Sequence, residues 1–242
     1  MNSAVIIAAA LGMRHGTDPD HLAAIDGLTR IRPRAANGVF FALGHGLVVI
    51  LLAIGMGHLL ADRFAFLGPW SLILIGAVNL WRLLRGSNQI HRHKHFVTAQ
   101  PFLLGMLLAA GFETASQLSA LILAGQNNAF LVGAAFSSGM VLVDGLDGYL
   151  AASTLRLAAF GEAKAKSASR ILGFIVVIFS FGLGGAELFG VELAPIALPL
   201  GLSLFIVVLG IRIWARSNRQ PAELEAVLAE PALAGNPART EG

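Results

Sequence analysis

Long apolar stretches separated by short polar segments run through most of the chain. A window of about 19 residues, the length that crosses a bilayer as a helix, finds seven of them. They lie near residues 4–27, 37–60, 65–84, 101–124, 128–155, 171–190 and 193–214. This pattern predicts an all-α, polytopic integral membrane protein with about seven transmembrane helices over residues 1–216. Residues 217–242, rich in Ala, Glu and Pro, are expected to form a flexible cytoplasmic tail.

The composition agrees with a chain that is solvated by lipid. Hydrophobic residues make up 56% and charged residues 13% of its 242 residues, whereas a soluble domain carries about 25% charged residues. The chain has no cysteine, which excludes disulfides, iron–sulfur clusters and thiolate metal sites. Its basic residues sit in short loops between apolar stretches rather than on one face, so the net charge of +3 does not indicate binding to nucleic acid.

The basic residues also predict how the helices are oriented. Of the 17 lysines and arginines, 15 follow the odd-numbered helices, among them Arg30 after the first and Arg212 at the end of the seventh. Arg63 alone belongs to the other side, and Arg14 falls within the first helix. The positive-inside rule then puts the C-terminus in the cytoplasm and the N-terminus outside, in the cytoplasmic membrane. A cleavable signal peptide is not expected, because the first apolar run lacks a basic segment before it.

Two imidazoles and two carboxylates interrupt the first apolar stretch, in the run His15-Gly16-Thr17-Asp18-Pro19-Asp20-His21. Ionisable groups are costly to bury in hydrocarbon and usually mark a function. Nitrogen and oxygen donors without thiolate suit nickel, cobalt and zinc better than copper(I). Pro19 removes a backbone donor and frees the carbonyl of His15, so we expect the helix to kink or break here and several of these groups to converge.

Three further polar groups of residues lie in the later apolar stretches. They are His45 between Gly44 and Gly46 in the second stretch, Glu113 with Gln117 in the fourth, and Met140 with Asp144 and Asp147 in the fifth. Two buried acids on one helix stripe need cations or protons nearby. A helix-packing network is the alternative for Glu113 and Gln117. We interpret His58 as a packing residue, and the alternating histidines of residues 91–95 as part of a solvated basic loop.

Together these motifs resemble those of the nickel/cobalt transporter family. Arg14-His15 through Asp20-His21 to Asp26 is similar to the family's His-x4-Asp-His signature, Leu43-Gly44-His45 to its second motif, Gly111-Phe112-Glu113-Thr114-Ala115 to Gly-Phe-Asp-Thr-Ala, and Gly139-Met140 through Asp144 to Asp147-Gly148 to Gly-Met…Asp-x-x-Asp-Gly. The chain departs from the family's usual residues at Pro19, Gly46, Glu113, Gln117 and Gly145. It begins immediately before the first motif, and we therefore expect a compact relative of the family's eight-helix members.

The resemblance implies secondary transport of a divalent metal ion, Ni²⁺ or Co²⁺, with uptake as the expected direction. The implied metal ligands are His15, Asp20, His21 and His45. The residues expected to supply charge around the ligands or to line the path are Asp18, Glu113, Met140, Asp144 and Asp147. The expected partners are the metal ion as substrate and membrane lipid, with no prosthetic group. The chain has no phosphate-binding Gly-x4-Gly-Lys-Ser/Thr sequence, so it cannot itself use ATP in the familiar way, and nothing in the sequence requires an ATPase subunit.

Three alternatives remain open at this level: export by a protein of the same superfamily, a membrane metal sensor that does not transport, and an intramembrane metalloenzyme. The chain lacks a His-Glu-x-x-His helix, which argues against the enzyme. A weak internal similarity aligns His21-Leu22-Ala23-Ala24-Ile25 with Gln117-Leu118-Ser119-Ala120-Leu121, and Phe41 through His45 with Phe136 through Met140. It indicates a 3+3 inverted repeat plus one helix, with chance similarity between apolar helices as the alternative.

Overall fold

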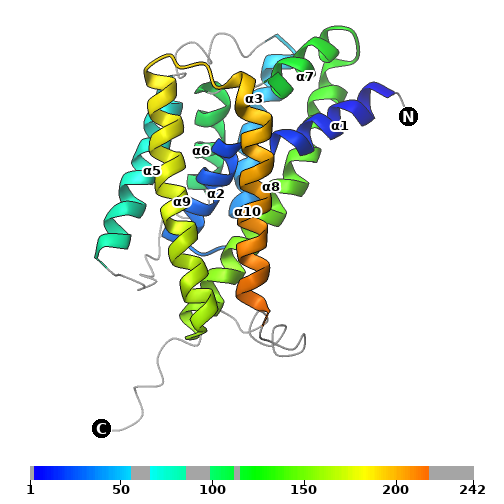
Figure 1. Cartoon of the computed structure of the whole chain (residues 1–242). Helices are drawn as coiled ribbons and strands as arrows, with labels where there is room; N and C mark the ends of the chain where they lie inside the picture. Colours follow the sequence, from blue (N-terminus) through cyan, green and yellow to red (C-terminus); the bar gives the residue numbers. More distant parts are fainter. Residues whose placement is uncertain (1–2, 56–65, 86–98, 112–114, 218–242) are drawn as a thin grey trace, which may run out of the picture.

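The computed structural model describes residues 3–55, 66–85, 99–111 and 115–217, and the regular structure in these ranges is entirely helical (Figure 1). It comprises α1 (Ser3–His15), α2 (Pro19–Ile31), α3 (Asn37–Ala53), α5 (Leu67–Leu84), α6 (Ala99–Gly111), α7 (Ala115–Gly125), α8 (Ala129–Ala159), α9 (Ala163–Leu188) and α10 (Ala194–Arg216). The all-α prediction is therefore confirmed for the part of the chain that the structure describes.

The predicted break in the first apolar stretch is confirmed. α1 ends at His15, and α2 begins at Pro19, which occupies its first position. Asp18 before the proline is extended, with φ −64° and ψ 146°, because the proline ring excludes helical geometry from the residue that precedes it. The carbonyl of Arg14 at the end of α1 accepts from both the backbone N–H and the hydroxyl of Thr17, at 3.1 and 2.6 Å.

The other predicted apolar stretches coincide with helices, with two differences. The stretch at 101–124 contains two helices, α6 and α7, where the hydropathy pattern predicted one. The stretch at 171–190 corresponds to α9, which begins at Ala163 and so extends into a polar segment. Predictions for His58, the histidines of residues 91–95, Glu113 and residues 218–242 fall outside the described residues.

Four of the helices, α5, α8, α9 and α10, are long and apolar enough to cross a membrane by length and composition. α1, α3 and α6 are shorter apolar helices. Large hydrophobic side chains stay exposed along the long helices, among them Leu142, Ile178 and Ile206, each at least 65% exposed. Such a surface is costly in water and suits lipid, which agrees with a multi-pass membrane protein.

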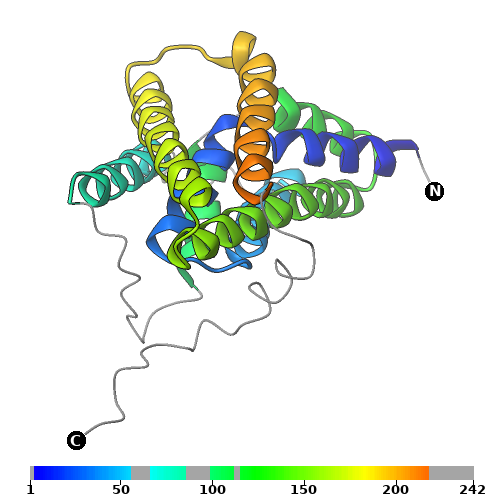
Figure 2. The same ribbon diagram turned by 60° about the horizontal axis from the view of Figure 1, so that its bottom comes forward.

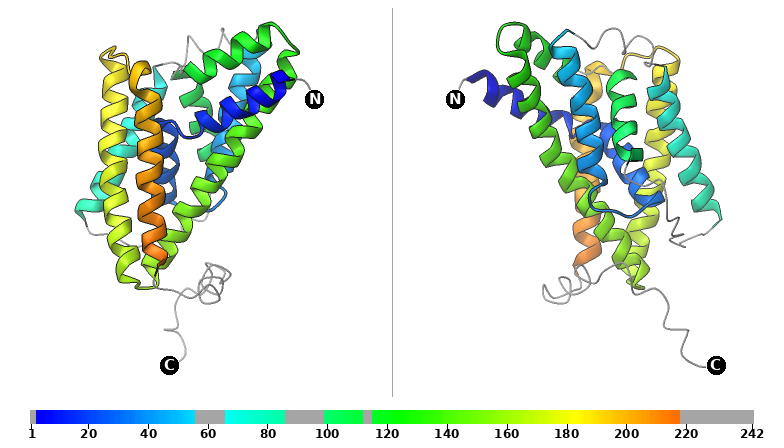
Figure 3. Two further views of the ribbon diagram at one scale, coloured as in Figure 1. Left: turned by 45° about the vertical axis from the view of Figure 1, so that its right-hand side comes forward. Right: turned by 180° about the vertical axis from the view of Figure 1, so that it is seen from behind.

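The helices surround α2, most of whose residues are buried. α9 and α10 stand side by side and both contact α2, which lies behind them in the view of Figure 2. On the opposite side, α3 packs between α6 and α8, and α5 packs against α9 (Figure 3). α1 lies across α8 near the upper end of the molecule. The break between α1 and α2 is thereby enclosed by helices from both halves of the chain.

Two helix crossings are unusually close because glycines face the partner's backbone. Where α1 crosses α8, a Cβ on Gly12 would lie 1.9 Å from the carbonyl oxygen of Phe136, and a Cβ on Gly139 would lie 2.1 Å from that of Ala9. Where α3 crosses α6, a Cβ on Gly44 would lie 1.9 Å from the carbonyl oxygen of Phe102, and a Cβ on Gly105 would lie 2.0 Å from that of Phe41. Small residues at both positions allow the backbones to touch, as in membrane helix pairs generally.

Candidate metal centre

Three histidines from three helices meet at the break between α1 and α2. His15 is the last residue of α1, His21 lies in the first turn of α2, and His45 lies in the middle of α3. All three are fully buried. One ring nitrogen from each histidine lies within 4.8 Å of the other two, and the Nε2 atoms of His15 and His45 are 3.0 Å apart. Nitrogen ligands on one ion at about 2.1 Å are separated by about 3 Å, so the cluster can hold a metal ion after a small contraction.

Carboxylates orient two of these rings. His15 Nδ1 donates to Asp18 Oδ2 at 2.9 Å, and His21 Nδ1 donates to Asp144 Oδ2 at 3.0 Å. With the proton on Nδ1, the lone pair of each ring is on Nε2. His21 Nε2 is buried and has no hydrogen-bond partner within the described ranges. Histidine ligands of metal ions are held in the same way, with the far nitrogen bonded to a carboxylate or carbonyl.

Residues of α3, α7 and α8 close the space around the histidines. The Ser116 hydroxyl, near the start of α7, lies 3.3 Å from His15 Nδ1, and the neighbouring Gln117 is buried. The ring of Phe136 is 5.3 Å from that of His15, and the ring of Phe41 is 5.0 Å from that of His21. The aromatic rings keep water from the imidazoles, and electrostatic interactions within the cluster are stronger in such a low-dielectric environment.

Two glycines allow α8 to bring Asp144 to the cluster. A Cβ on Gly16 would lie 3.0 Å from Asp144 Oδ1, and a Cβ on Gly38 would lie 1.7 Å from the backbone oxygen of Asp144. Any side chain at Gly38 would therefore displace α8, and even a methyl at Gly16 would crowd the carboxylate. Neither glycine was singled out by sequence reasoning, although Gly16 stands inside the polar run itself.

The remaining predicted residues occupy different surroundings. Asp20, next to His21 in α2, is buried but lies outside the group formed by the three histidines, so its role as a ligand stays a prediction. Met140 is fully buried in an apolar cluster with Ala42 and Phe136. Asp147 is also fully buried, and its Oδ1 accepts from the guanidinium of Arg212 at 2.5 Å.

Sequence reasoning missed the role of Arg212. The sequence groups Arg212 with the basic residues that mark the cytoplasmic end of the helices, whereas in the structure its side chain in α10 is only 1% exposed and is paired inside the protein. It donates to Asp26 Oδ1 of α2 at 2.8 Å as well as to Asp147 of α8. Arg30 donates to the other oxygen of Asp26 at 2.9 Å. The available signal was its position inside an apolar stretch, where a charged side chain needs a buried partner.

Comparison with known proteins places the histidine-bearing segment in a described family. The family model for NicO, high-affinity nickel-transport protein, matches residues 1–61, which contain all three histidines. The chain is 30% identical to the hydrogenase nickel incorporation protein HupN of Bradyrhizobium diazoefficiens, over 63% of this chain and 55% of HupN. It is 28% identical to a high-affinity nickel transport protein of Cupriavidus necator, over 76% and 69% of the two chains.

A third relative, the cobalt transport protein NhlF of Rhodococcus rhodochrous, is 46% identical over 54 residues, which are 20% of this chain and 15% of NhlF. No solved structure matches the chain. The chain spans little more than half the length of HupN. The four motifs and the buried histidines agree with these similarities: residues 1–61 match the NicO model, and the chain is similar over most of its length to a high-affinity nickel transport protein.

Proposed function

We propose that this protein carries Ni²⁺ or Co²⁺ across the cytoplasmic membrane as a secondary transporter and binds the ion at the three histidines. The observation that carries the proposal is the cluster itself: His15, His21 and His45 are buried together inside an apolar helical chain. Imidazole donors without thiolate suit these ions. The relatives named as nickel and cobalt transport proteins support the same substrates.

Charge balance favours a divalent ion at this position. Three buried acids, Asp18, Asp20 and Asp144, lie beside the histidines, and Arg14 is 3.9 Å from Asp18, so these side chains carry two net negative charges when the imidazoles are neutral. A doubly charged ion on the Nε2 side neutralises them, whereas buried charges without a counter-ion are costly. We retain Asp20 as a proposed fourth ligand, because its Oδ2 is buried without a hydrogen-bond partner among the described residues.

The two glycine crossings support the proposed inverted repeat. The internal alignment pairs Phe41 with Phe136. A glycine of a crossing helix packs against the backbone carbonyl of each: Gly105 of α6 against Phe41, and Gly12 of α1 against Phe136. The alignment also pairs Gly44 with Gly139, and Gly44 packs on α6 while Gly139 packs on α1. The proposed repeat relates α1, α2 and α3 to α6, α7 and α8, and its two copies therefore share corresponding helix contacts as well as similar sequence. Inverted repeats with a site at their interface suit transport by alternating access.

We assign the cytoplasmic side to the end where α5, α8 and α10 finish, at the bottom of Figure 1. Arg82, Arg156 and Arg216 lie in the last turns of these helices. The positive-inside rule places such residues in the cytoplasm. Uptake is the proposed direction of transport.

Reconstitution into vesicles tests the function directly. Purified protein in proteoliposomes should accumulate ⁶³Ni, and the same protein in detergent should bind it with a stoichiometry near one. His45→Ala should lose both activities, whereas His91→Ala, which removes a histidine predicted to lie in a loop, should keep both. Binding without accumulation would indicate a sensor and contradict transport, and accumulation only from vesicles loaded with nickel would indicate export.

A further inference from the structure

A second buried polar group lies beside the histidine cluster. Arg212 of α10 bridges Asp26 of α2 and Asp147 of α8, at 2.8 and 2.5 Å. Asp147 follows Asp144 by three residues on α8, and Asp26 follows His21 by five on α2. At 1.5 Å per residue these separations are about 4.5 and 7.5 Å along the helices. The bridge therefore forms the next layer below the histidines, toward the C-terminal end of α10.

The bridge does not use all of its polar atoms. Asp147 Oδ2 and Arg212 Nε are buried and have no hydrogen-bond partner within the described ranges. One oxygen of Asp147 is thus available on the helix face that also carries Asp144. Carboxylate oxygens are donors for divalent ions, so an ion that leaves the histidines toward this end meets Asp147 next.

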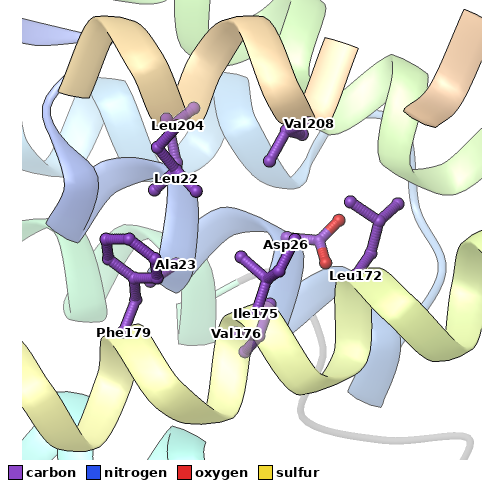
Figure 4. Close-up of a pocket in the computed structure, with 9 residues that line it drawn as sticks. All are labelled: Leu22, Ala23, Asp26, Leu172, Ile175, Val176, Phe179, Leu204 and Val208. Atoms are coloured by element: carbon purple, nitrogen blue, oxygen red, sulfur yellow. The ribbon is translucent and has the colours of Figure 1, made fainter. Parts of the chain in front are cut away.

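The opposite flank of the bridge offers no such donor. A pocket between α2, α9 and α10 borders Asp26, and Figure 4 shows the Asp26 carboxylate next to Leu172 and Ile175. Every other residue that lines this pocket is apolar. Hydrocarbon side chains have no donor atoms that could replace the ligands of an ion. Among the described residues, Asp26 and Asp147 thus supply the carboxylate oxygens of this layer; the guanidinium of Arg212 holds one oxygen of each, and Arg30 holds the other oxygen of Asp26.

α10 also contacts the histidine layer. A Cβ on Gly201 would lie 2.7 Å from the carbonyl oxygen of Thr17 and 3.4 Å from Asp18 Cα, so α10 rests directly on the break between α1 and α2. Eleven residues, about three turns, separate Gly201 from Arg212. One helix thus touches the break with its first half and holds the two acids with its second. A shift of α10 changes both layers together.

We propose that Arg212 is a tethered cation that competes with the transported metal ion for Asp26 and Asp147. While it is in place, its charge repels an ion at the histidines, and its guanidinium occupies one carboxylate oxygen of each acid in the next layer. When α10 withdraws it, the two acids accept the ion and release it onward. This inference rests on the proposed function. In it, Arg212 is not a ligand of the metal ion but controls how tightly the ion binds and how fast it is released.

Binding and transport should therefore change in opposite directions when the charge is removed. Arg212→Gln leaves Asp147 without a counter-charge and Asp26 with Arg30 alone. Nickel should therefore bind in detergent about tenfold more tightly, while ⁶³Ni uptake into proteoliposomes slows because the ion is retained. Arg216→Gln is the matched control, since Arg216 lies one turn along α10 and bonds to Ser153 and the carbonyl of Leu150 rather than to an acid. It should leave both measurements unchanged.

Two further variants keep the test decisive if Arg212→Gln does not fold. Arg212→Lys retains the charge and should bind nickel as the wild type does. The double variant Arg212→Gln, Asp147→Asn removes one charge of each sign and should restore wild-type affinity. Weaker binding in Arg212→Gln, or equal binding in all variants, overturns the inference and leaves the proposed function standing. A wild-type protein that neither binds nor transports nickel overturns both.

Discussion

The histidine cluster and the Arg212 bridge lie in adjacent layers of α2 and α8, and both contain buried carboxylates. In the bridge, Asp26 and Asp147 meet two arginines, Arg30 and Arg212, which are fixed parts of the chain. In the cluster, Asp18 and Asp144 meet histidines at 2.9 and 3.0 Å, which need not carry a charge, and the arginine nearby, Arg14, lies farther off, 3.9 Å from Asp18. The counter-charge of the two layers therefore differs. A fixed cation makes a layer that holds helices together, whereas neutral imidazoles leave room for a cation that exchanges.

The difference should be largest in stability. Asp26→Ala leaves Arg212 and Arg30 without one of their acids, and breaking a buried ion pair from one side costs about 3–5 kcal/mol. We expect a clear fall in the melting temperature of the purified protein in detergent. Asp18→Ala, in the histidine layer, should lower it much less in the absence of metal. Equal falls for the two variants would show that the layers do not differ in this way.

A ligand variant should separate the layers by function. His21→Ala removes one of three imidazoles and should weaken nickel binding by at least about 100-fold, with uptake lost at an unchanged amount of protein in the membrane. Isothermal titration and ⁶³Ni uptake measure the two quantities. Addition of imidazole to His21→Ala should restore part of the binding if the ring itself is the ligand. Retention of wild-type uptake would rule out the cluster as the site.

The orienting carboxylates should have an intermediate effect. Asp144→Asn keeps a hydrogen-bond acceptor for His21 but removes a negative charge, so we expect affinity to fall about 10- to 100-fold. Parallel titrations with Ni²⁺, Co²⁺ and Zn²⁺ should show unequal losses, because the charge on the ring's partner tunes each ion differently. Glu192→Gln, at an exposed acid between α9 and α10, is the control and should change none of them. Unchanged affinity in Asp144→Asn would confine the site to α1, α2 and α3.

The smallest effect should come from crowding the histidine layer without changing its charges. Gly16→Ala places a methyl 2.9 Å from the Val143 Cβ and 3.0 Å from Asp144 Oδ1. It should therefore weaken nickel binding by less than the loss of the carboxylate does. Gly210→Ala on α10, where a Cβ meets nothing within 4 Å, should bind nickel as the wild type does. A loss in Gly16→Ala as large as that in Asp144→Asn would mean that α8 is displaced as a whole.

The sequence predicted the parts of the fold that follow from local chemistry. Apolar stretches of sufficient length gave the helices, and Pro19 gave the break, because proline excludes a continuous helix on steric grounds. His15 and His21 then converge because the extended residue Asp18 lets the chain turn between them. The end of α6 at Gly111 was not predicted, since no proline marks it and the polar residues that follow, Glu113 and Gln117, can also lie on one face of a continuous helix.

The parts that depend on long-range packing were beyond such reasoning. Asp20 and His21 are consecutive residues of one helix, so their side chains point about 100° apart, and which of them faces His45 depends on how α2 sits against α3. Arg212 looks like any basic residue near a helix end until α10 is placed against α2 and α8. Counting basic residues predicts how the helices are oriented in the membrane, but it does not show which acids a given arginine pairs with.

The bond between Asp26 and Arg212 also joins residues that are synthesised far apart in time, because 186 positions separate them. At about 5–20 residues per second, a ribosome needs about 10 to 40 s to reach Arg212 after Asp26 has emerged. During that interval Asp26 has only Arg30, four residues away, as its partner. This part of the interior is therefore completed only when α10 packs against α2 and α8. A nascent chain that is released before α10 has entered the bilayer has an unfinished interior and is exposed to the quality-control proteases of the membrane.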